Sequence, residues 1–264
     1  MIHLRTATEM ETIGEAGTII ADLLIALPER VEPGVSTAAI DHFAEEFIAS
    51  YEGATAAFKG LYGFPGSVCI SLNEEVVHGI PGDGRILDEG AIVSIDVGVR
   101  LNGWCADSAW TYTVGEVSTE ARTLMEVTEQ ALTAAVEAAV PGNHVGDIGA
   151  AVVCTVKGTG YGIIRELVGH GVGRDVHEEP QVPNIGRSGH GPLLRAGMVL
   201  AIEPMLSEGS ASIRTLDDGW TVVTADRKLS AHFEHTVGIT EDGPKVLTSI
   251  TGPVSAKSST SGMA

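Results

Sequence analysis

The sequence is short of several residue types, and each shortage excludes a class of protein. It contains three cysteines, an odd number with no Cys-x-x-Cys pair, which argues against a disulfide framework and favours a reducing compartment. Lys and Arg number 16 against 35 Asp and Glu, and the formal charge of −19 would repel a nucleic-acid backbone. The chain has no run of about 18 apolar residues and no apolar signal core near its N-terminus. We therefore expect a cytoplasmic protein that binds neither nucleic acid nor a membrane.

The residues that are present fit a globular protein with two similar halves. Hydrophobic residues make up 44% of the chain and charged residues 19%, which is ordinary for one large core or two smaller ones. A capping box at Thr6–Glu9 and helical apolar spacing predict a helix that ends near Pro28, and a second helix from near Ser36. A helix over residues 120–140 and an apolar pattern from Ile148 repeat this arrangement at an offset of 108 residues.

The offset maps Pro33-Gly34 onto Pro141-Gly142. Coincidence is the alternative, because Pro-Gly is a common pair, but apolar residues on both sides also match. Segments typical of strands follow each helix pair: residues 67–72, 91–99 and 104–114 in the first half, and 198–203, 221–224 and 231–239 in the second. We predict one α+β domain over residues 1–251, with halves of about 1–115 and 116–251, and a disordered Ser/Gly-rich tail over 252–264.

Four carboxylates interrupt these apolar segments: Asp96, Asp107, Glu203 and Glu234. A charged group rarely lies in an apolar strand unless it is paired or binds a metal, because its desolvation costs several kcal/mol. The four positions therefore indicate a metal site.

Hairpin geometry predicts that the first two carboxylates converge. Asn102-Gly103 lies between two strand-like segments, which favours a two-residue type I′ turn and places Gly98 opposite Asp107. Because side chains alternate between faces, Asp96 and Asp107 become diagonal neighbours with backbones about 7–8 Å apart. Two carboxylates so placed repel each other unless a cation lies between them. The alternative from this hairpin alone is that each Asp caps a loop or binds an Arg.

The second half supplies two more acids and a nitrogen donor. Glu203 and Glu234 repeat the pattern of an acid in an apolar segment, and His170 lies in a glycine-rich motif that runs from Gly169 to Pro180. Glycines let the backbone approach a crowded site closely. Four carboxylates and a neutral imidazole carry a formal charge of −4, which two divalent cations would neutralise, so we expect a dinuclear centre.

Several strings of the sequence resemble one enzyme family, the type I methionine aminopeptidases. They are residues 67–74 (SVCISLNE), 77–81 (VHGIP), 94–97 (SIDV), 170–180 (HGVGRDVHEEP), 201–205 (AIEPM) and 233–236 (FEHT). The resemblance runs from about Ile2 to Thr251 and implies the pita-bread fold, in which two pseudo-symmetric α+β halves with antiparallel sheets covered by helices surround a dinuclear metal site.

The same resemblance implies roles for individual residues. The metal ligands would be Asp96, Asp107, His170, Glu203 and Glu234, with Asp107 and Glu234 bridging both ions, and Glu203 would also accept the proton of the attacking water. His78 and His177 would act in catalysis and substrate binding without being ligands. Without the motifs, each of these two histidines would more simply be a structural residue.

A pocket for the methionine side chain would be lined by Phe64, Cys69, Trp220 and Leu61, with Val176 nearby. Absent the family, Cys69 and Trp220 would most simply be core residues. The chain departs from many relatives in carrying Cys105-Ala106 before Asp107. By strand alternation Cys105 shares a face with Asp107, so we expect a reactive thiol close to the site.

The activity implied is removal of the initiator methionine from nascent polypeptides with a small second residue. The cofactors would be two divalent ions, with Mn, Fe, Co and Zn all admitted by oxygen-rich ligation and one imidazole. We expect a monomer, and the ribosome is the one partner that this role suggests. The alternatives are a proline-specific aminopeptidase, which usually carries an additional N-terminal domain, and a pita-bread module that has lost catalysis and binds peptides or partners.

Overall fold

The computed structural model describes residues 1–250, so the tail expected over residues 252–264 lies outside the described residues. The helices are α1 (Ala7–Ala26), α2 (Thr37–Ala49), α3 (Thr119–Ala138) and α4 (Val145–Val156), with single 3-10 turns η1 (Leu27–Glu29) and η2 (Leu61–Gly63). The strands that build the larger sheets are β1 (Ala54–Ala56), β2 (Cys69–Leu72), β4 (Ile92–Leu101), β5 (Trp104–Thr113), β7 (Gly169–Gly171), β8 (Glu178–Val182), β9 (Val199–Ile202), β14 (His235–Thr240) and β15 (Gly243–Val246). Shorter strands are β3 (Glu75–Val77), β6 (Gly162–Ile163), β10 (Met205–Ser207), β11 (Ile213–Thr215), β12 (Val222–Thr224) and β13 (Ser230–His232).

The predicted helices are present, and local signals account for their starts. The Thr6 side chain accepts from the backbone of Glu9, and the Glu9 carboxylate accepts from the backbone of Thr6, which completes the expected capping box of α1. Ser118 caps α3 through the backbone N–H of Ala121. No helix within residues 1–250 is long and apolar enough to cross a membrane.

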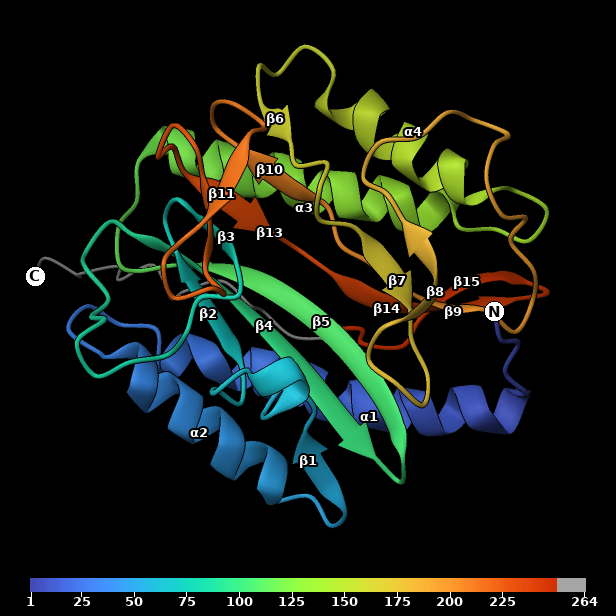
Figure 1. Ribbon diagram of the computed structural model, residues 1–264, viewed down its shortest axis with the longest axis horizontal. Helices are drawn as coiled ribbons and strands as arrows, with labels where there is room; N and C mark the ends of the chain where they lie inside the picture. The colour runs from blue at the N-terminus through green and yellow to red at the C-terminus, as the bar shows by residue number, and fades with distance from the viewer. Residues whose placement is uncertain (251–264) are drawn as a thin grey trace, which may run out of the picture.

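The two helix pairs lie on opposite sides of the strands. In Figure 1, α1 and α2 lie below the long β4–β5 hairpin, and α3 and α4 lie above β7, β8, β9, β14 and β15 of the second half. One sheet holds β1 and β2 along one edge of β4 and β5 along the other, and the second sheet has the order β15-β14-β9-β7-β8. All strand pairs within these sheets are antiparallel, as expected for the α+β class.

The β4–β5 hairpin has the predicted turn and register. Asn102 and Gly103 both have positive φ, 52° and 76°, as a type I′ turn requires. Gly98 pairs with Asp107, and Asp96 pairs with Ala109 two residue pairs further on. Asp96 and Asp107 are therefore diagonal neighbours on one face of the sheet, as the sequence predicted.

The turns before α2 and α4 repeat one another at the predicted offset. Gly34, with φ 88°, donates its N–H to the Leu87 carbonyl at 2.8 Å, and Gly142, with φ 92°, donates to the Leu194 carbonyl at 3.0 Å. Isolated bridges follow at equivalent places, Ser36 with Ile86 and His144 with Leu193. These matches support an internal duplication, which stays a prediction.

The strand predicted over residues 231–239 is wrong, because two strands of different sheets share that segment. Residues 233 and 234 separate β13 from β14. The N–H of Glu234 is not part of either strand's ladder and donates instead to the Ala109 carbonyl of β5 at 2.9 Å. Glu203 likewise follows β9 rather than lying in it. Pro204 comes next and has no N–H to continue a ladder, so the chain breaks there before β10.

Hydrogen bonds from side chains join the two halves along β5. The Thr236 hydroxyl donates to the Asp107 carbonyl at 2.7 Å and accepts from the Asp107 N–H at 2.9 Å. Ser108 donates to the carbonyl of Glu234 at 2.6 Å. We call the junction between β5 and residues 232–236 the seam. It carries two of the four carboxylates of interest.

The end of the second half returns to α1, and a pair of substitutions tests this contact. A Cβ at Gly17 would lie 2.2 Å from the Leu247 carbonyl oxygen, whereas a Cβ at Gly14 meets only a methyl group of Leu247 at 3.8 Å. We expect Gly17→Ala to destabilise the protein by about 1–3 kcal/mol through overpacking. Gly14→Ala, one turn earlier, should stabilise it by about 0.5–1 kcal/mol through helix propensity. Urea unfolding measures both, and equal midpoints for the two variants would contradict the contact.

Candidate active site

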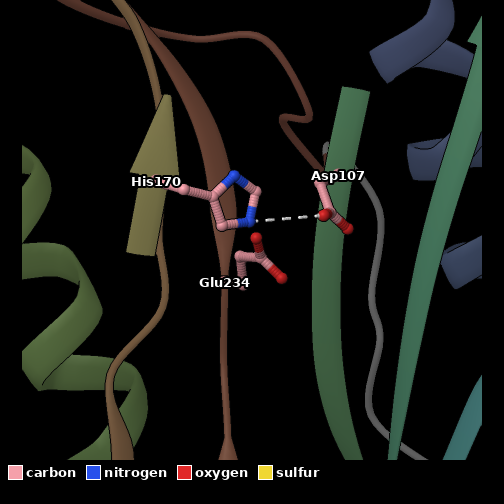
Figure 2. A group of neighbouring side chains, drawn as sticks. All are labelled: Asp107, His170 and Glu234. Atoms are coloured by element: carbon pink, nitrogen blue, oxygen red, sulfur yellow. Dashed lines mark ion pairs between the residues drawn. The ribbon is translucent and has the colours of Figure 1, made fainter. Parts of the chain in front are cut away.

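The four carboxylates gather at the centre of the molecule with His170. Asp96 and Asp107 project from β4 and β5, and Glu203 and Glu234 from the strand breaks that follow β9 and β13. Asp107 and Glu234 are only 3% and 2% exposed. Figure 2 shows His170 of β7 directed toward Asp107 with Glu234 beside the ring. The His170 Nε2 lies 3.8 Å from Asp107 Oδ2 and 3.5 Å from Glu203 Oε1.

The glycines around His170 permit this position because β7 is hydrogen-bonded between two other strands. A Cβ at Gly169 would lie 2.3 Å from the Ala201 carbonyl oxygen of β9, and a Cβ at Gly171 would lie 2.3 Å from the carbonyl oxygen of Glu179. The Nδ1 atom of His170 lies 3.0 Å from the Gly171 carbonyl. If Nδ1 carries the proton, the lone pair of Nε2 is directed at the carboxylates.

Burial makes the four carboxylates resist ionisation. Desolvation raises the pKa of Asp96 to about 7, and it raises that of Asp107 well above the ordinary value, with the negative charges of Glu234 and Asp96 adding to the shift. The pKa values of Glu203 and Glu234 are raised for the same reasons. Within residues 1–250, the imidazoles of His170 and His232 lie within 4 Å of Asp107, Glu203 or Glu234, and no Lys or Arg nitrogen lies within 4 Å of any of the four carboxylates.

The site fits divalent metal ions. Three of its buried oxygens, Asp96 Oδ1, Asp107 Oδ1 and Glu234 Oε1, have no hydrogen-bond partner among the described residues. Ligand atoms of Asp107, His170 and Glu234 lie within 4.8 Å of one another. Buried charged oxygens are found paired or bound to a metal, and this donor set of carboxylates with one imidazole suits first-row divalent ions.

A cavity of about 340 Å³ opens above these residues. Its lining includes all five predicted ligands, both predicted catalytic histidines and the four predicted pocket residues: Asp96, Asp107, His170, Glu203, Glu234, His78, His177, Phe64, Cys69, Trp220 and Leu61. The structure therefore brings these eleven residues to one place, whereas their individual roles remain predictions.

Aromatic rings form one wall of the cavity. Phe64 meets Trp220 edge to face at a centroid distance of 5.2 Å, and His78 meets the same indole at 6.3 Å. The ring of His177 lies 4.4 Å from that of His170, so it borders the carboxylates as well as the cavity. Val176 is buried and does not itself line the cavity, but it directly precedes His177, which does, so its place near the pocket stays a prediction.

The sequence reasoning missed several residues of the site, among them Tyr62 and His232. Tyr62 lines the cavity, is 76% exposed and stacks on His177 with ring centroids 6.0 Å apart. His232 is 2% exposed beside Glu203 and Glu234, and burial lowers its pKa to about 3, so the ring is neutral. The only sequence signal for His232 was its place two residues before Glu234.

Cys105 does not have the reactivity predicted for it. Its side chain is fully buried, its Sγ lies 3.7 Å from the Arg174 carbonyl, and it does not line the cavity. Burial raises the pKa of the thiol to about 11, which suppresses the thiolate.

The exposures predict which thiol reacts first. The three cysteines are free, and Cys154 is exposed whereas Cys69 and Cys105 are buried. We expect a disulfide reagent to label one thiol of the folded protein rapidly and Cys154→Ser to remove that fast phase. Burial also raises the pKa of Cys69 well above its usual range. Labelling of Cys105 as fast as that of Cys154 would contradict its burial.

Comparison with known proteins agrees with this geometry. The model of the family described as "Metallopeptidase family M24" matches residues 11–241. The chain belongs to metallopeptidase family M24. Within that family it is 52% identical to the methionine aminopeptidase of Clostridium perfringens over 250 residues, which are 95% of this chain and 100% of the relative. The resemblance found in the sequence is thereby confirmed.

Solved structures of two kinds of peptidase resemble this chain to different degrees. The methionine aminopeptidase of Thermotoga maritima superposes with a TM-score of 0.92 at 42% identity, covering 94% of this chain and 99% of that one. The prolidase of Pyrococcus furiosus superposes with a TM-score of 0.76 at 26% identity and covers 93% of this chain but only 65% of that one. The predicted pita-bread fold is confirmed, and the likeness is greater to the methionine aminopeptidase.

Metal binding should stabilise the folded protein measurably. An ion held only by the folded state adds about 2.7 kcal/mol when its concentration is a hundredfold above Kd. We expect Mn(II) or Co(II) to raise the Tm of metal-stripped protein and Asp107→Ala to lose this response. Equal melting with and without metal at millimolar concentrations would contradict the site. Glu11→Ala, on the exposed side of α1, serves as a control that keeps the response.

Proposed function

We propose that this M24 protein is a metal-dependent aminopeptidase that removes the initiator methionine from polypeptides with a small second residue. The observation that carries the proposal is the joining of two features in one cavity. Its floor is a cluster of buried carboxylates around His170, and its wall is an apolar pocket with two aromatic rings and a sulfur atom. Such a pocket suits a thioether side chain.

The residues that would hold the metal are Asp96, Asp107, His170, Glu203 and Glu234. We infer that they would hold two divalent ions, with Asp107 and Glu234 as the ligands that the two ions would share, because four carboxylates carry a charge that one ion would leave uncompensated. When bound, the ions polarise the scissile carbonyl and increase the acidity of a water molecule. Mn, Fe, Co and Zn are all compatible with these ligands.

The remaining chemistry falls to side chains in the cavity. Glu203 would accept a proton from the attacking water and pass it on. His177 would donate a hydrogen bond to the scissile amide and stabilise charge that develops on it. Burial lowers the pKa values of His177 and His78, so both rings are neutral donors. His78 would orient the substrate or assist protonation of the leaving amine by relaying a proton.

The preference for a small second residue is supported by the mouth of the cavity. Tyr62 stacks on His177, so a substrate whose scissile bond lies at His177 passes the phenol ring with its second residue. A bulky side chain would meet that ring. Nascent polypeptides would then be selected by their first two residues.

Further features of the proposal concern the setting of the reaction. We infer a cytoplasmic monomer that acts on nascent chains near the ribosome, since initiator methionine is exposed there first. Residues 1–251 would form the catalytic domain, with internal halves of about 1–115 and 116–251 that each contribute two of the carboxylates. A protein of the same fold without catalysis and a proline-specific aminopeptidase are the alternatives.

Release of methionine from a Met-Gly-Met peptide tests the proposal. Metal-stripped protein should be inactive, and Mn(II), Fe(II) or Co(II) should restore release, except in Asp107→Ala. We expect His177→Ala to lose about 10²–10³-fold in kcat because a donor to the transition state is removed. His42→Ala serves as the matched control, since His42 is exposed on α2 and pairs only with Glu46.

The alternatives give different outcomes in the same assay. Bound metal without release from any peptide would support the non-catalytic module. Cleavage confined to peptides with a proline second residue would support the proline-specific enzyme.

A further inference from the structure

His232 lies beneath the carboxylate cluster on the seam, in a place that the predicted ligand set does not explain. Its backbone is fixed by Thr111, whose hydroxyl donates to the His232 carbonyl at 2.8 Å and accepts from the His232 N–H at 3.0 Å. The imidazole is 2% exposed, and neither ring nitrogen has a hydrogen-bond partner within the described part of the chain. A buried polar ring without a partner calls for an explanation.

The direction of the His232 ring supplies an explanation. The Nε2 atom lies 3.9 Å from Glu203 Oε2 and 3.9 Å from Glu234 Oε2, which is longer than a hydrogen bond to either. The other oxygen of Glu203, Oε1, lies 3.5 Å from His170 Nε2. Glu203 is thus flanked by two imidazoles, one near each oxygen.

We propose that His232 is a positioning residue for the metal centre, whose Nε2–H attracts the Oε2 atoms of Glu203 and Glu234 and leaves their other oxygens for the ions. Carboxylates that bind metals are commonly oriented by donors outside the ligand set, and loss of such a partner typically costs about 10–100-fold in metal affinity. A neutral imidazole has one N–H and can serve two acceptors in turn or share the proton between them. This inference rests on the metal site of the proposed function.

The arrangement also explains why a polar ring is placed here rather than an apolar one. An apolar side chain of the same size would present no N–H to these two buried carboxylates, which is unfavourable for charged groups. His232 offers its N–H without adding a charge. It therefore orients two ligands while leaving their negative charge for the ions.

Metal affinity, measured apart from activity, tests the proposal. Metal-stripped protein is titrated with Co(II) by calorimetry and by visible absorption, which reports the ligand geometry of the ion. We expect His232→Leu to weaken Co(II) binding by about 10–100-fold and to change the absorption spectrum. His232→Gln keeps an N–H donor near the same place and should retain both the affinity and the spectrum of the parent.

His235→Gln is the matched control. His235 directly follows Glu234, but its Nδ1 lies 3.0 Å from the hydroxyl of Thr248, away from the cluster, so this variant should bind Co(II) as the parent does. Circular dichroism of the metal-free variants establishes that they are folded, and His232→Ala replaces His232→Leu should the latter fail to fold.

Each outcome bears on one claim. Unchanged Co(II) affinity in both His232→Leu and His232→Ala overturns the positioning role. A His232→Gln variant as weak as His232→Leu overturns the N–H group as the basis of that role, since a donor alone does not rescue the affinity. Failure of the parent protein to bind Co(II) would instead overturn the metal site of the proposed function.

Discussion

The repulsion among four buried carboxylates is the constraint on which the rest of this structure depends. Two such groups 4 Å apart repel by about 4 kcal/mol at an effective dielectric of about 20. Asp96, Asp107, Glu203 and Glu234 face one another without a Lys or Arg ion pair within the described residues. Only a scaffold that is stable elsewhere can hold such a cluster in place. Two cores, one packed against α1 and α2 and the other against α3 and α4, supply that stability.

The repulsion between carboxylates of the two halves is concentrated at the seam, which holds Asp107 and Glu234. Its bonds between Thr236, Ser108 and the backbone on either side use neutral groups, so they add no charge to the crowded centre. Neutral bonds also satisfy the backbone where β13 ends and β14 begins, which is where Glu234 must turn toward Asp107. The break in the strand is therefore the means by which the second half delivers its carboxylate.

The parts of this arrangement that could be predicted from the sequence are those determined by a few neighbouring residues. Asn102-Gly103 specifies its own turn, and the turn specifies the register, so the approach of Asp96 to Asp107 followed from few residues. The helix starts at Thr6 and Ser118 were equally local. The ligand set and the pocket came instead from family motifs, because no spacing rule brings residues 107 and 234 together.

The predictions that failed depended on contacts between residues far apart in the sequence. The change of sheet at Phe233-Glu234 depends on a hydrogen bond to Ala109, more than a hundred residues away, and alternation of apolar residues cannot reveal it. Cys105 shares a face with Asp107 in the pattern, yet its burial depends on the Gly173–Arg174 segment that covers it. His232 lacked any motif of its own. In each case the missing information was a contact between the two halves.

The contact of Leu247 with Gly17 closes the molecule by joining its last strand to its first helix. During synthesis, α1 leaves the ribosome long before the segment that must pack on it. A nascent fragment that ends after β5 holds only two of the four carboxylates. The full set of predicted ligands is therefore present only after residue 234 has been synthesised.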